Sequence, residues 1–254
     1  MSEQLGVLGV GHLASYTLAG LRNAGDSRPV LLSPRNRERA LSLAVEHGCE
    51  VAVDNEMVVD RTRLILLSVR PEQVNELLQN LTFTSEHLLI SCVAGMSLSE
   101  IAPLVSPARV IRAMPLACAE VGEGAIALFP DHPEVRQLMA QMGCVIPFED
   151  EDSYEVASVA ACMNGWMYAF FEQLTDWYVG QGIESTRARE LVLHSVSGAT
   201  GLALARPELA LGVISDSIAT EGTFTKLGLD LLQAQDSFGS WQQACERVAK
   251  ALKS

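Results

Sequence analysis

The sequence predicts an α/β fold in which a doubly wound parallel sheet is followed by a domain made only of helices. Short apolar runs of strand character alternate with helical segments through the first half of the chain, as they do when crossover helices join parallel strands. After residue 148 the strand pattern ends and helical periodicity replaces it. We therefore predict a sheet domain over residues 1–150 and a helical domain over residues 151–254.

The predicted elements follow from the spacing of apolar residues. Strands are expected at residues 5–10, 29–32, 50–52, 63–68, 88–92, 110–113, 124–129 and 144–147, with helices at 14–24, 37–47, 71–78 and 98–104. In the second half, further helices are expected at 186–205, 207–217, 223–233 and 241–252.

One long helix is predicted at the start of the second half. Asp152 and Glu155 have the spacing of a reciprocal N-terminal cap, and apolar residues then recur at three and four positions until Gly180 and Gly182. This gives a helix of roughly 28 residues. Its wide apolar face predicts partial burial against a second subunit, with a central core helix as the alternative.

The first predicted strand ends in a glycine-rich turn with the pattern Gly9-x-Gly11-x-x-Ala14. In a Rossmann-type dinucleotide site, the first glycine permits a tight turn and the second lets the backbone approach a pyrophosphate. Ala14 would allow the next helix to pack closely on the strand, while His12 and Leu13 lie in the phosphate-facing part of the turn. The alternative is a plain connection between a strand and a helix.

The end of the second predicted strand favours NADP(H) over NAD(H). An NAD site usually places a carboxylate about 20 residues after the glycines, where it binds the ribose 2′-hydroxyl. Here the chain has Ser33, Arg35 and Arg37 instead. A hydroxyl and guanidinium groups suit a 2′-phosphate, although a solvated basic loop is the alternative.

Composition narrows the classes of function further. The 254 residues carry a net charge of −13, which on average repels nucleic acid and anionic membranes. The six cysteines are scattered without a Cys-x-x-Cys pair, and the sequence shows neither a signal peptide nor a long apolar span. No residues have metal-ligand spacing. We expect a cytoplasmic protein without a metal site.

Several motifs beyond the glycine turn resemble the pyrroline-5-carboxylate reductases, which reduce a cyclic imine to proline with a nicotinamide hydride. Their order and spacing match that family over most of residues 5–129. The motifs are Ser33-Pro34-Arg35, Ser68-Val69-Arg70-Pro71-Glu72-Gln73, Ser91-Cys92-Val93-Ala94-Gly95, Arg109-Val110-Ile111-Arg112-Ala113-Met114-Pro115 and Val121-Gly122-Glu123-Gly124.

The resemblance implies roles for residues in these motifs. It places Asn55 near the adenosine ribose and Ala94 and Gly95 against the nicotinamide. The remaining cofactor-binding positions that it implies are Ser68, Val69, Arg70, Pro71, Met114 and Pro115. It also implies a C-terminal domain of the 6-phosphogluconate dehydrogenase type that intertwines with a second copy, giving a homodimer or a higher oligomer with the active site between domains.

The sequence departs from the family pattern where the substrate is expected. Leu116 replaces the usual asparagine after Met-Pro, and Arg70 replaces a lysine. The family's Gly-Ser-Gly-Pro-Ala-Tyr and Pro-Gly-Gly-Thr-Thr motifs are replaced by Ala161-Cys162-Met163-Asn164-Gly165-Trp166 and Thr220-Glu221-Gly222-Thr223-Phe224. Phe224 stands where the family has the threonine that binds the imine nitrogen, and Glu221 would repel a substrate carboxylate.

Three residues are therefore the candidate catalytic groups. Thr223, or alternatively Thr225, would bind the imine nitrogen, and Lys226 would pair with a carboxylate or donate a proton unless it is simply solvated. Asn164 also matches an asparagine of the β-hydroxyacid dehydrogenases, but Met167 stands where that group has its catalytic lysine.

The function expected from these residues is NADPH-dependent reduction of a C=N bond in a cyclic imine, such as 1-pyrroline-5-carboxylate, or in a related small imine. The cofactor carries this chemistry, and the protein orients the reactants and excludes water. The alternatives are a keto-acid reductase of the β-hydroxyacid dehydrogenase type and a protein that senses NADP(H) without turnover.

Overall fold

The computed structural model describes residues 4–252, which fall into two compact units. The first unit runs to Ala161 and includes the last residues from Ala249, and the second holds residues 162–248. The domain boundary predicted after residue 150 lies at the end of the sheet and stays a prediction.

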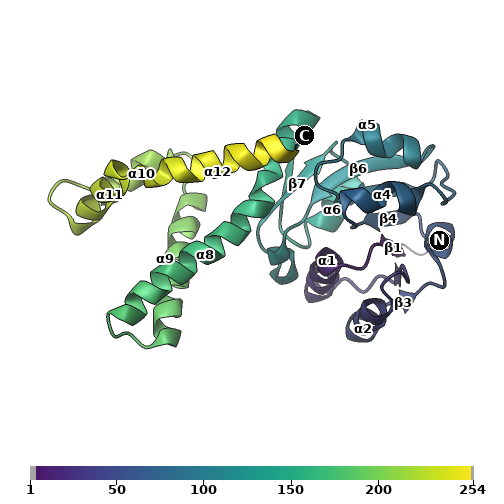
Figure 1. Cartoon of the computed structure of the whole chain (residues 1–254), viewed down its shortest axis with the longest axis horizontal. Helices are drawn as coiled ribbons and strands as arrows, with labels where there is room; N and C mark the ends of the chain where they lie inside the picture. Colours follow the sequence, from purple (N-terminus) through teal and green to yellow (C-terminus); the bar gives the residue numbers. More distant parts are fainter. Residues whose placement is uncertain (1–3, 253–254) are drawn as a thin grey trace. The chain divides into compact units, whose positions relative to one another are not determined.

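Within residues 4–252, eight strands form one sheet in the order β3-β2-β1-β4-β5-β6-β7-β8 (Figure 1). All eight were expected from the sequence, near these positions. The strands are β1 (Leu5–Leu8), β2 (Val30–Leu32), β3 (Glu50–Val51), β4 (Leu64–Leu67), β5 (Leu88–Ser91), β6 (Arg109–Met114), β7 (Ala125–Phe129) and β8 (Cys144–Pro147).

The sheet differs from the wholly parallel one predicted at a single pairing. The pairings are parallel except that between β6 and β7, where Ala113 lies opposite Leu128 in an antiparallel register. Only residues 115–124 join these two strands, and they include the 3-10 helix η2 (Ala117–Val121). A parallel crossover needs about a dozen residues or more, so this connection is too short to return the chain in the same direction.

Helices cover both faces of the sheet. Apolar side chains of α1 (His12–Asn23), α2 (Arg37–His47) and α6 (Pro133–Met139) belong to one buried cluster. Those of α3 (Asn55–Arg61), α4 (Pro71–Leu78) and α5 (Leu98–Ile101) belong to the other, with the 3-10 helix η1 (Ala102–Leu104) packed beside it. Residues of the central strands alternate between the two clusters, as Val7 and Leu8 of β1 do, so β1, β4 and β5 are buried on both sides.

The long helix predicted at the start of the second half is two helices, so that prediction was wrong. The structure has α7 (Glu151–Ala157) and α8 (Val159–Gly180), with Ser158 between them. Asp150 caps α7 by accepting a hydrogen bond from Ser153 N at 2.8 Å, which replaces the predicted Asp152 and Glu155 cap. Glu155 instead pairs with the buried guanidinium of Arg112, which explains why it is unavailable for capping.

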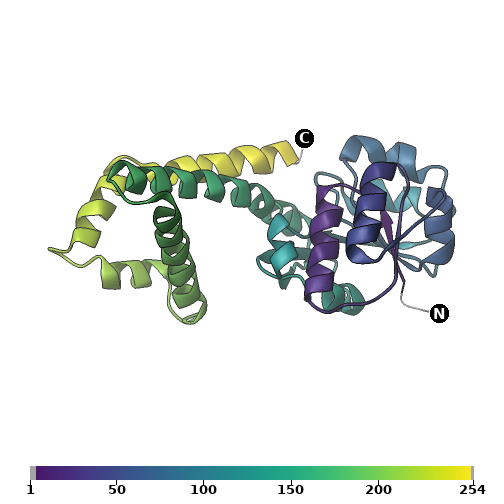
Figure 2. The same ribbon diagram turned by 90° about the horizontal axis from the view of Figure 1, so that it is seen from below.

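The second unit contains helices and loops without a strand in residues 162–248 (Figure 2). Its helices are most of α8, then α9 (Ser185–Leu204), α10 (Leu211–Ile218), α11 (Phe224–Ala234) and the larger part of α12 (Ser237–Leu252). Trp241 of α12 contacts Trp166 and Phe170 of α8, with ring centroids 6.3 and 6.0 Å apart. Among the residues that the structure describes, no helix has both the length and the apolar character needed to cross a membrane.

Candidate functional site

The glycine turn after β1 is held from both sides by the neighbouring strands. The Gly9 amide donates to Ser33 Oγ at 3.0 Å, beyond β2, and Ser68 Oγ, beyond β4, donates to the Gly9 carbonyl at 2.7 Å. Gly9 has φ +96°, and a Cβ there would lie 2.4 Å from Val69 Cγ1 and 2.6 Å from the Ser68 carbonyl oxygen. Both the conformation and the space therefore require glycine.

The N-terminus of α1 emerges from this turn with its amides available. Gly11 is the N-cap residue, so no side chain caps the helix, and the first turn holds no acidic residue. Unpaired amides and the positive end of the helix dipole make such a terminus suited to a phosphate group. Ala14 is fully buried, consistent with close packing of α1 on the sheet.

A cavity of about 690 Å³ opens beside the turn. It brings together residues that the sequence placed at the cofactor, from the turn, the loop after β2 and the start of α4. The predicted residues that line it are Gly9, Gly11, His12, Leu13, Arg35, Ser68, Val69 and Arg70, and Val10, Asn36, Arg37, Gln73 and Cys92 complete the lining. These lining residues include three arginines and no carboxylate, so the cavity suits an anionic ligand.

Some predicted cofactor residues lie elsewhere in the first unit. Ser33 is buried beneath the turn and supports Gly9. Asn55 begins α3, and its buried Oδ1 has no hydrogen-bond partner within residues 4–252. Pro71 is the first residue of α4. The other four lie near the ends of β5 and β6: Ala94 and Gly95 follow β5, Met114 is the last residue of β6, and Pro115 follows it.

The nicotinamide-side residues share an apolar cluster. Ala94 packs against the buried group that includes Met114, Leu116 and Tyr154. Gly95 follows with φ +68°, a left-handed conformation that favours glycine. The resemblance places both Ala94 and Gly95 near the reacting ring, and these roles stay predictions.

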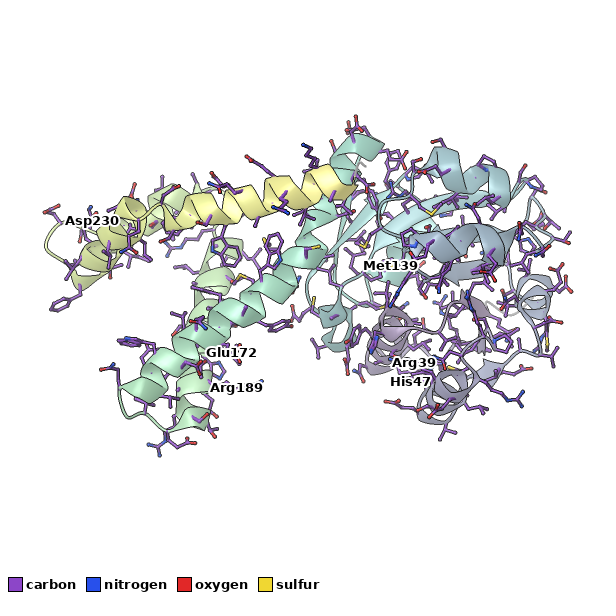
Figure 3. All side chains as sticks on the ribbon, viewed as in Figure 1. Arg39, His47, Met139, Glu172, Arg189 and Asp230 are labelled. Carbon is purple, nitrogen blue, oxygen red and sulfur yellow. The ribbon has the colours of Figure 1, made fainter. Side chains whose placement is uncertain are left out.

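Sequence reasoning missed Arg39, which lies in the first turn of α2. Arg39, labelled in Figure 3, donates from Nη2 to Ser15 Oγ of α1 at 3.0 Å and so links the two helices that flank the cavity. Its amide also donates to the Asn36 side chain, the N-cap of α2. Arginines recur at positions 35, 37 and 39, and this pattern was a signal in the sequence. Their spacing alone did not show which of the three side chains would contact α1.

Sequence reasoning also missed a buried ion-pair cluster around Arg112. This guanidinium is fully buried, lies 2.8 Å from Glu151 Oε1 and 2.7 Å from Glu155 Oε2, and stacks over the Tyr154 ring at 4.5 Å. Burial raises the pKa of the Tyr154 hydroxyl. An arginine between apolar residues of β6 was the available signal, because a buried charge requires partners.

The candidate catalytic residues all lie in the second unit. Thr223 is the N-cap of α11, where its hydroxyl accepts from Lys226 N at 3.2 Å and donates to the Thr220 carbonyl at 2.7 Å. The hydroxyl proton is therefore engaged in the structure. Asn164 lies on α8 and is half-buried. The catalytic roles of both residues stay predictions.

Lys226 is paired within its own helix. Its ammonium forms an ion pair with Asp230, one turn further along α11, and this hydrogen bond raises the pKa of Lys226. A lysine that keeps its proton more firmly is better suited to binding an anionic group than to donating a proton near neutral pH. Residues 4–252 contain no group of three or more His, Cys, Asp or Glu side chains arranged to hold a metal ion.

Two family models match the chain, one in each half. Residues 4–95 match the family described as "NADP oxidoreductase coenzyme F420-dependent", and residues 151–254 match "Pyrroline-5-carboxylate reductase dimerisation". The second match covers the two altered motifs at residues 161–166 and 220–224.

Similar proteins extend over nearly the whole chain. A pyrroline-5-carboxylate reductase of Methanosarcina acetivorans is 24% identical over 99% of this chain and 97% of its own. The solved structure of 1-pyrroline-5-carboxylate reductase from Streptococcus pyogenes has a TM-score of 0.88 at 24% identity, covering 98% of each chain. That of Plasmodium falciparum pyrroline carboxylate reductase with NADP bound has a TM-score of 0.87 at 21% identity, covering 100% of this chain and 98% of the other. The predicted Rossmann-type fold with a helical dimerisation domain is confirmed.

Proposed function

We propose that this chain is a member of the pyrroline-5-carboxylate reductase family and uses NADPH to reduce a C=N bond in a cyclic imine such as 1-pyrroline-5-carboxylate or in a related small imine. The observation that carries the proposal is the cavity beside Gly9 and Gly11, which places the free N-terminus of α1 next to arginine side chains. A dinucleotide with an additional phosphate matches this combination of groups.

The loop after β2 supports NADPH as the cofactor. Arg35 and Arg37 are exposed and line the cavity, and no carboxylate stands at the end of β2 to bind a ribose 2′-hydroxyl. A planar guanidinium binds phosphate through two parallel hydrogen bonds, so either arginine can hold a 2′-phosphate. Ser33 contributes indirectly, because its hydroxyl is committed to the Gly9 amide.

The roles of this chain's residues follow from that placement. NADPH, when bound, supplies the hydride that the imine carbon accepts. The amides at the start of α1 hold the pyrophosphate, and Ala94 and Gly95 orient the nicotinamide side of the cofactor. A water, or Thr223 relaying a proton from solvent, protonates the nitrogen, and Thr223 first releases its bond to the Thr220 carbonyl. Asn164 orients the substrate.

Two further parts of the proposal concern the role of Lys226 and the oligomeric state. Lys226, a firmly protonated ammonium, attracts a substrate carboxylate and so offsets the repulsion expected from Glu221. The match to a dimerisation domain over residues 151–254 supports a homodimer formed by the second unit.

Steady-state kinetics with two cofactors test the proposal. We expect NADPH oxidation with at least one member of a panel of cyclic imines, and a lower KM for NADPH than for NADH. A double substitution, Arg35→Ala with Arg37→Ala, should raise the KM for NADPH about 10- to 100-fold, since charged hydrogen bonds contribute roughly 1.5–3 kcal/mol, and leave the KM for NADH nearly unchanged.

A matched control comes from Arg61, an exposed arginine of α3 that pairs with Glu50 away from the cavity. Arg61→Ala should leave the KM for both cofactors unchanged. A preference for NADH would contradict the cofactor proposal. Turnover of keto acids alone would favour a β-hydroxyacid dehydrogenase type of reaction, and tight NADPH binding without any turnover would favour a sensor, which the altered substrate motifs permit.

A further inference from the structure

We propose that Glu151 is a positioning residue that ties the nicotinamide-facing loop, residues 94–98, to the buried Arg112. This inference rests on the proposed function, because it assigns the loop its place at the reacting end of NADPH. The loop begins at Ala94, after two buried residues that follow β5. It ends at Leu98, the first residue of α5.

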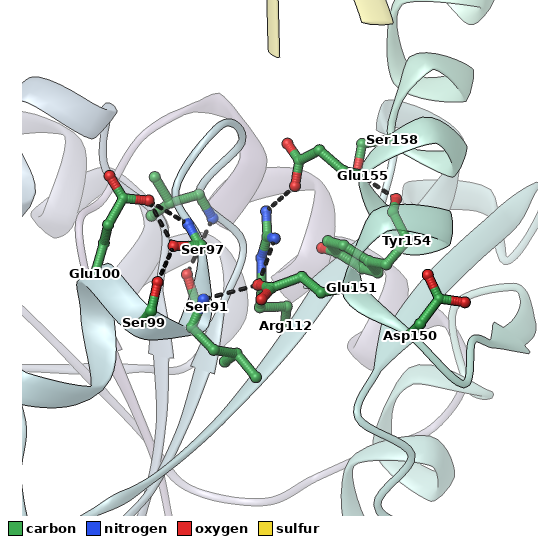
Figure 4. A network of polar contacts seen from close by, with 12 residues as sticks. Ser91, Ser97, Ser99, Glu100, Arg112, Asp150, Glu151, Tyr154, Glu155 and Ser158 are labelled. Carbon is green, nitrogen blue, oxygen red and sulfur yellow. Dashed lines mark hydrogen bonds and ion pairs between the residues drawn. The ribbon is translucent and has the colours of Figure 1, made fainter. Parts of the chain in front are cut away.

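One carboxylate oxygen makes the connection. Glu151 Oε1 accepts a hydrogen bond from the Leu98 amide at 2.7 Å and another from Arg112 Nη1 at 2.8 Å (Figure 4). Glu151 begins α7, Arg112 lies in β6 and Leu98 begins α5, so a single side chain joins three elements. The glutamate therefore couples the end of the loop to a strand inside the sheet.

Arg112 gives the loop a fixed point of attachment. Its side chain is fully buried, stacks on Tyr154 and has a second carboxylate partner in Glu155. A buried guanidinium held by two carboxylates and a ring has little freedom, because leaving any of these partners exposes an uncompensated charge in an apolar environment.

The rest of the loop has local bonds of its own. Ser97 forms a capping box with Glu100 at the start of α5, and the Val93 amide donates to Ser91 Oγ at 3.3 Å. These bonds link the loop only to adjacent parts of the chain. Glu151 supplies a long-range hydrogen bond to the loop, because it lies 53 residues away from Leu98 in the sequence. Ala94 and Met96 also pack among apolar residues of the sheet, and Glu151 adds the hydrogen bond that joins the end of the loop at Leu98 to Arg112 of β6.

Glu155 offers a matched control within the same cluster. It pairs with Arg112 at 2.7 Å, as Glu151 does at 2.8 Å, but the structure shows no hydrogen bond from Glu155 to any residue of the loop 94–98. Removing either carboxylate takes one partner from Arg112, and only the removal of Glu151 also releases Leu98. The two substitutions separate loop positioning from general stability.

The test compares Glu151→Ala, Glu155→Ala and Glu151→Gln in the full chain. Hydrogen exchange of the amides in residues 94–98 is measured with and without NADPH. We expect exchange in this loop at least tenfold faster in Glu151→Ala, with the protection by NADPH reduced, and wild-type exchange in Glu155→Ala. Glutamine retains an oxygen that can accept from Leu98, so Glu151→Gln should restore protection.

Kinetics add a second measurement. Glu151→Ala should lower kcat with 1-pyrroline-5-carboxylate about 10- to 100-fold and leave the Kd for NADPH within about twofold, because the phosphate contacts persist while the reacting ring is less well placed. Glu155→Ala should leave kcat within about threefold of wild type, even if its melting temperature falls.

The outcomes are distinguishable from a failure of the proposed function. If the wild type turned over no imine, that function would fail, and the exchange data would still show whether Glu151 fixes the loop against NADPH. Equal loop exchange in Glu151→Ala and wild type would overturn the positioning role, as would equal losses in the two alanine variants.

Discussion

The two units differ in how completely each buries its own apolar residues. In the first unit, β1 and β4 are buried along their whole length between two clusters of helical side chains. In residues 162–248, all of which the structure describes, only Ala188, Val192 and Ala219 are buried. Large apolar side chains there remain exposed, including Trp177 at 59%, Leu211 at 70% and Leu227 at 70%.

The difference indicates that the two units obtain stability from different sources. A sheet covered on both faces completes its core within one chain, whereas helices with exposed apolar faces need another surface to cover them. The match of residues 151–254 to a dimerisation domain favours a second copy of this chain as that surface. Three experiments test or refine this comparison.

The largest effect is expected from charges on the exposed apolar face of α11. Leu227 and Leu231 are 70% and 59% exposed in the single chain, and full burial of a leucine contributes about 1.5–3 kcal/mol. Replacing both by aspartate should raise the dimer dissociation constant by about two to four orders of magnitude. Light scattering after size exclusion measures the shift from dimer to monomer.

The control for that experiment lies in the first unit. Val45 on α2 is 88% exposed, more than either leucine, and Val45→Asp should leave the dimer intact because it does not lie on the dimerisation unit. A dimer that survives the α11 double substitution, or dissociates equally with Val45→Asp, would contradict the contrast between the units.

A smaller effect is expected at the glycine turn of the first unit. Gly9→Ala puts a Cβ into contact with Val69 and the Ser68 carbonyl in a left-handed conformation, so the turn must move and carry the α1 amides with it. The Kd for NADPH should rise about 100-fold, roughly 2.8 kcal/mol, measured from the change in cofactor fluorescence on binding.

The variant Gly25→Ala is the control that separates the effect of backbone strain from the effect of steric contact. Gly25 also has a positive φ, +83°, but no atom lies within 4 Å of a Cβ placed there. Gly25→Ala should cost stability of about 1 kcal/mol and leave NADPH affinity unchanged. Equal loss of affinity in both variants would show that the close contact at Gly9 is not what requires glycine.

The smallest effect concerns the buried thiol at the end of β5. Burial raises the pKa of Cys92 from 9.0 to about 12, so the folded protein retains this proton when the unfolded chain has lost it. The stability that this provides is complete below pH 9 and is lost as pH rises toward 12. Between pH 8 and pH 10 the free energy of unfolding should fall by about 1.4 kcal/mol from this group.

Urea unfolding at the two pH values measures that loss, with Cys92→Ala as the reference. Other titrating groups act equally in both proteins, so the variant should show a pH dependence smaller by the contribution of the thiol. Identical pH dependence in the two proteins would contradict the raised pKa of the buried Cys92 thiol.

The fold was largely predictable because its signals are local. Buried parallel strands appear as short apolar runs, and the turn at Gly9 follows directly from a glycine pattern next to the first of them. The seven-residue helices α3 and α6 were not predicted, because so few residues hold too little periodicity to stand out.

The candidate site was predictable only in part. Motifs gathered at the turn and at the starts of α1 and α4 gave most of the residues that line the cavity. Ser33 was assigned to the cofactor because its side chain type suits a phosphate, yet the structure turns its hydroxyl toward Gly9. The orientation of a side chain depends on the strand that carries it and on the residues that it contacts. A short motif specifies neither of these.

By itself, the sequence determined the α/β class, the glycine turn and the change to helices after the sheet, because each depends on residues close together along the chain. Only the tertiary structure decided the antiparallel pairing of β7, the break between α7 and α8, and the meeting of Arg112 with Glu151 and Glu155. Glu155 has the spacing of a helix cap, but a buried guanidinium 43 positions earlier outweighs that local preference. A charge inside the core must be neutralised by whatever partner the fold brings within reach.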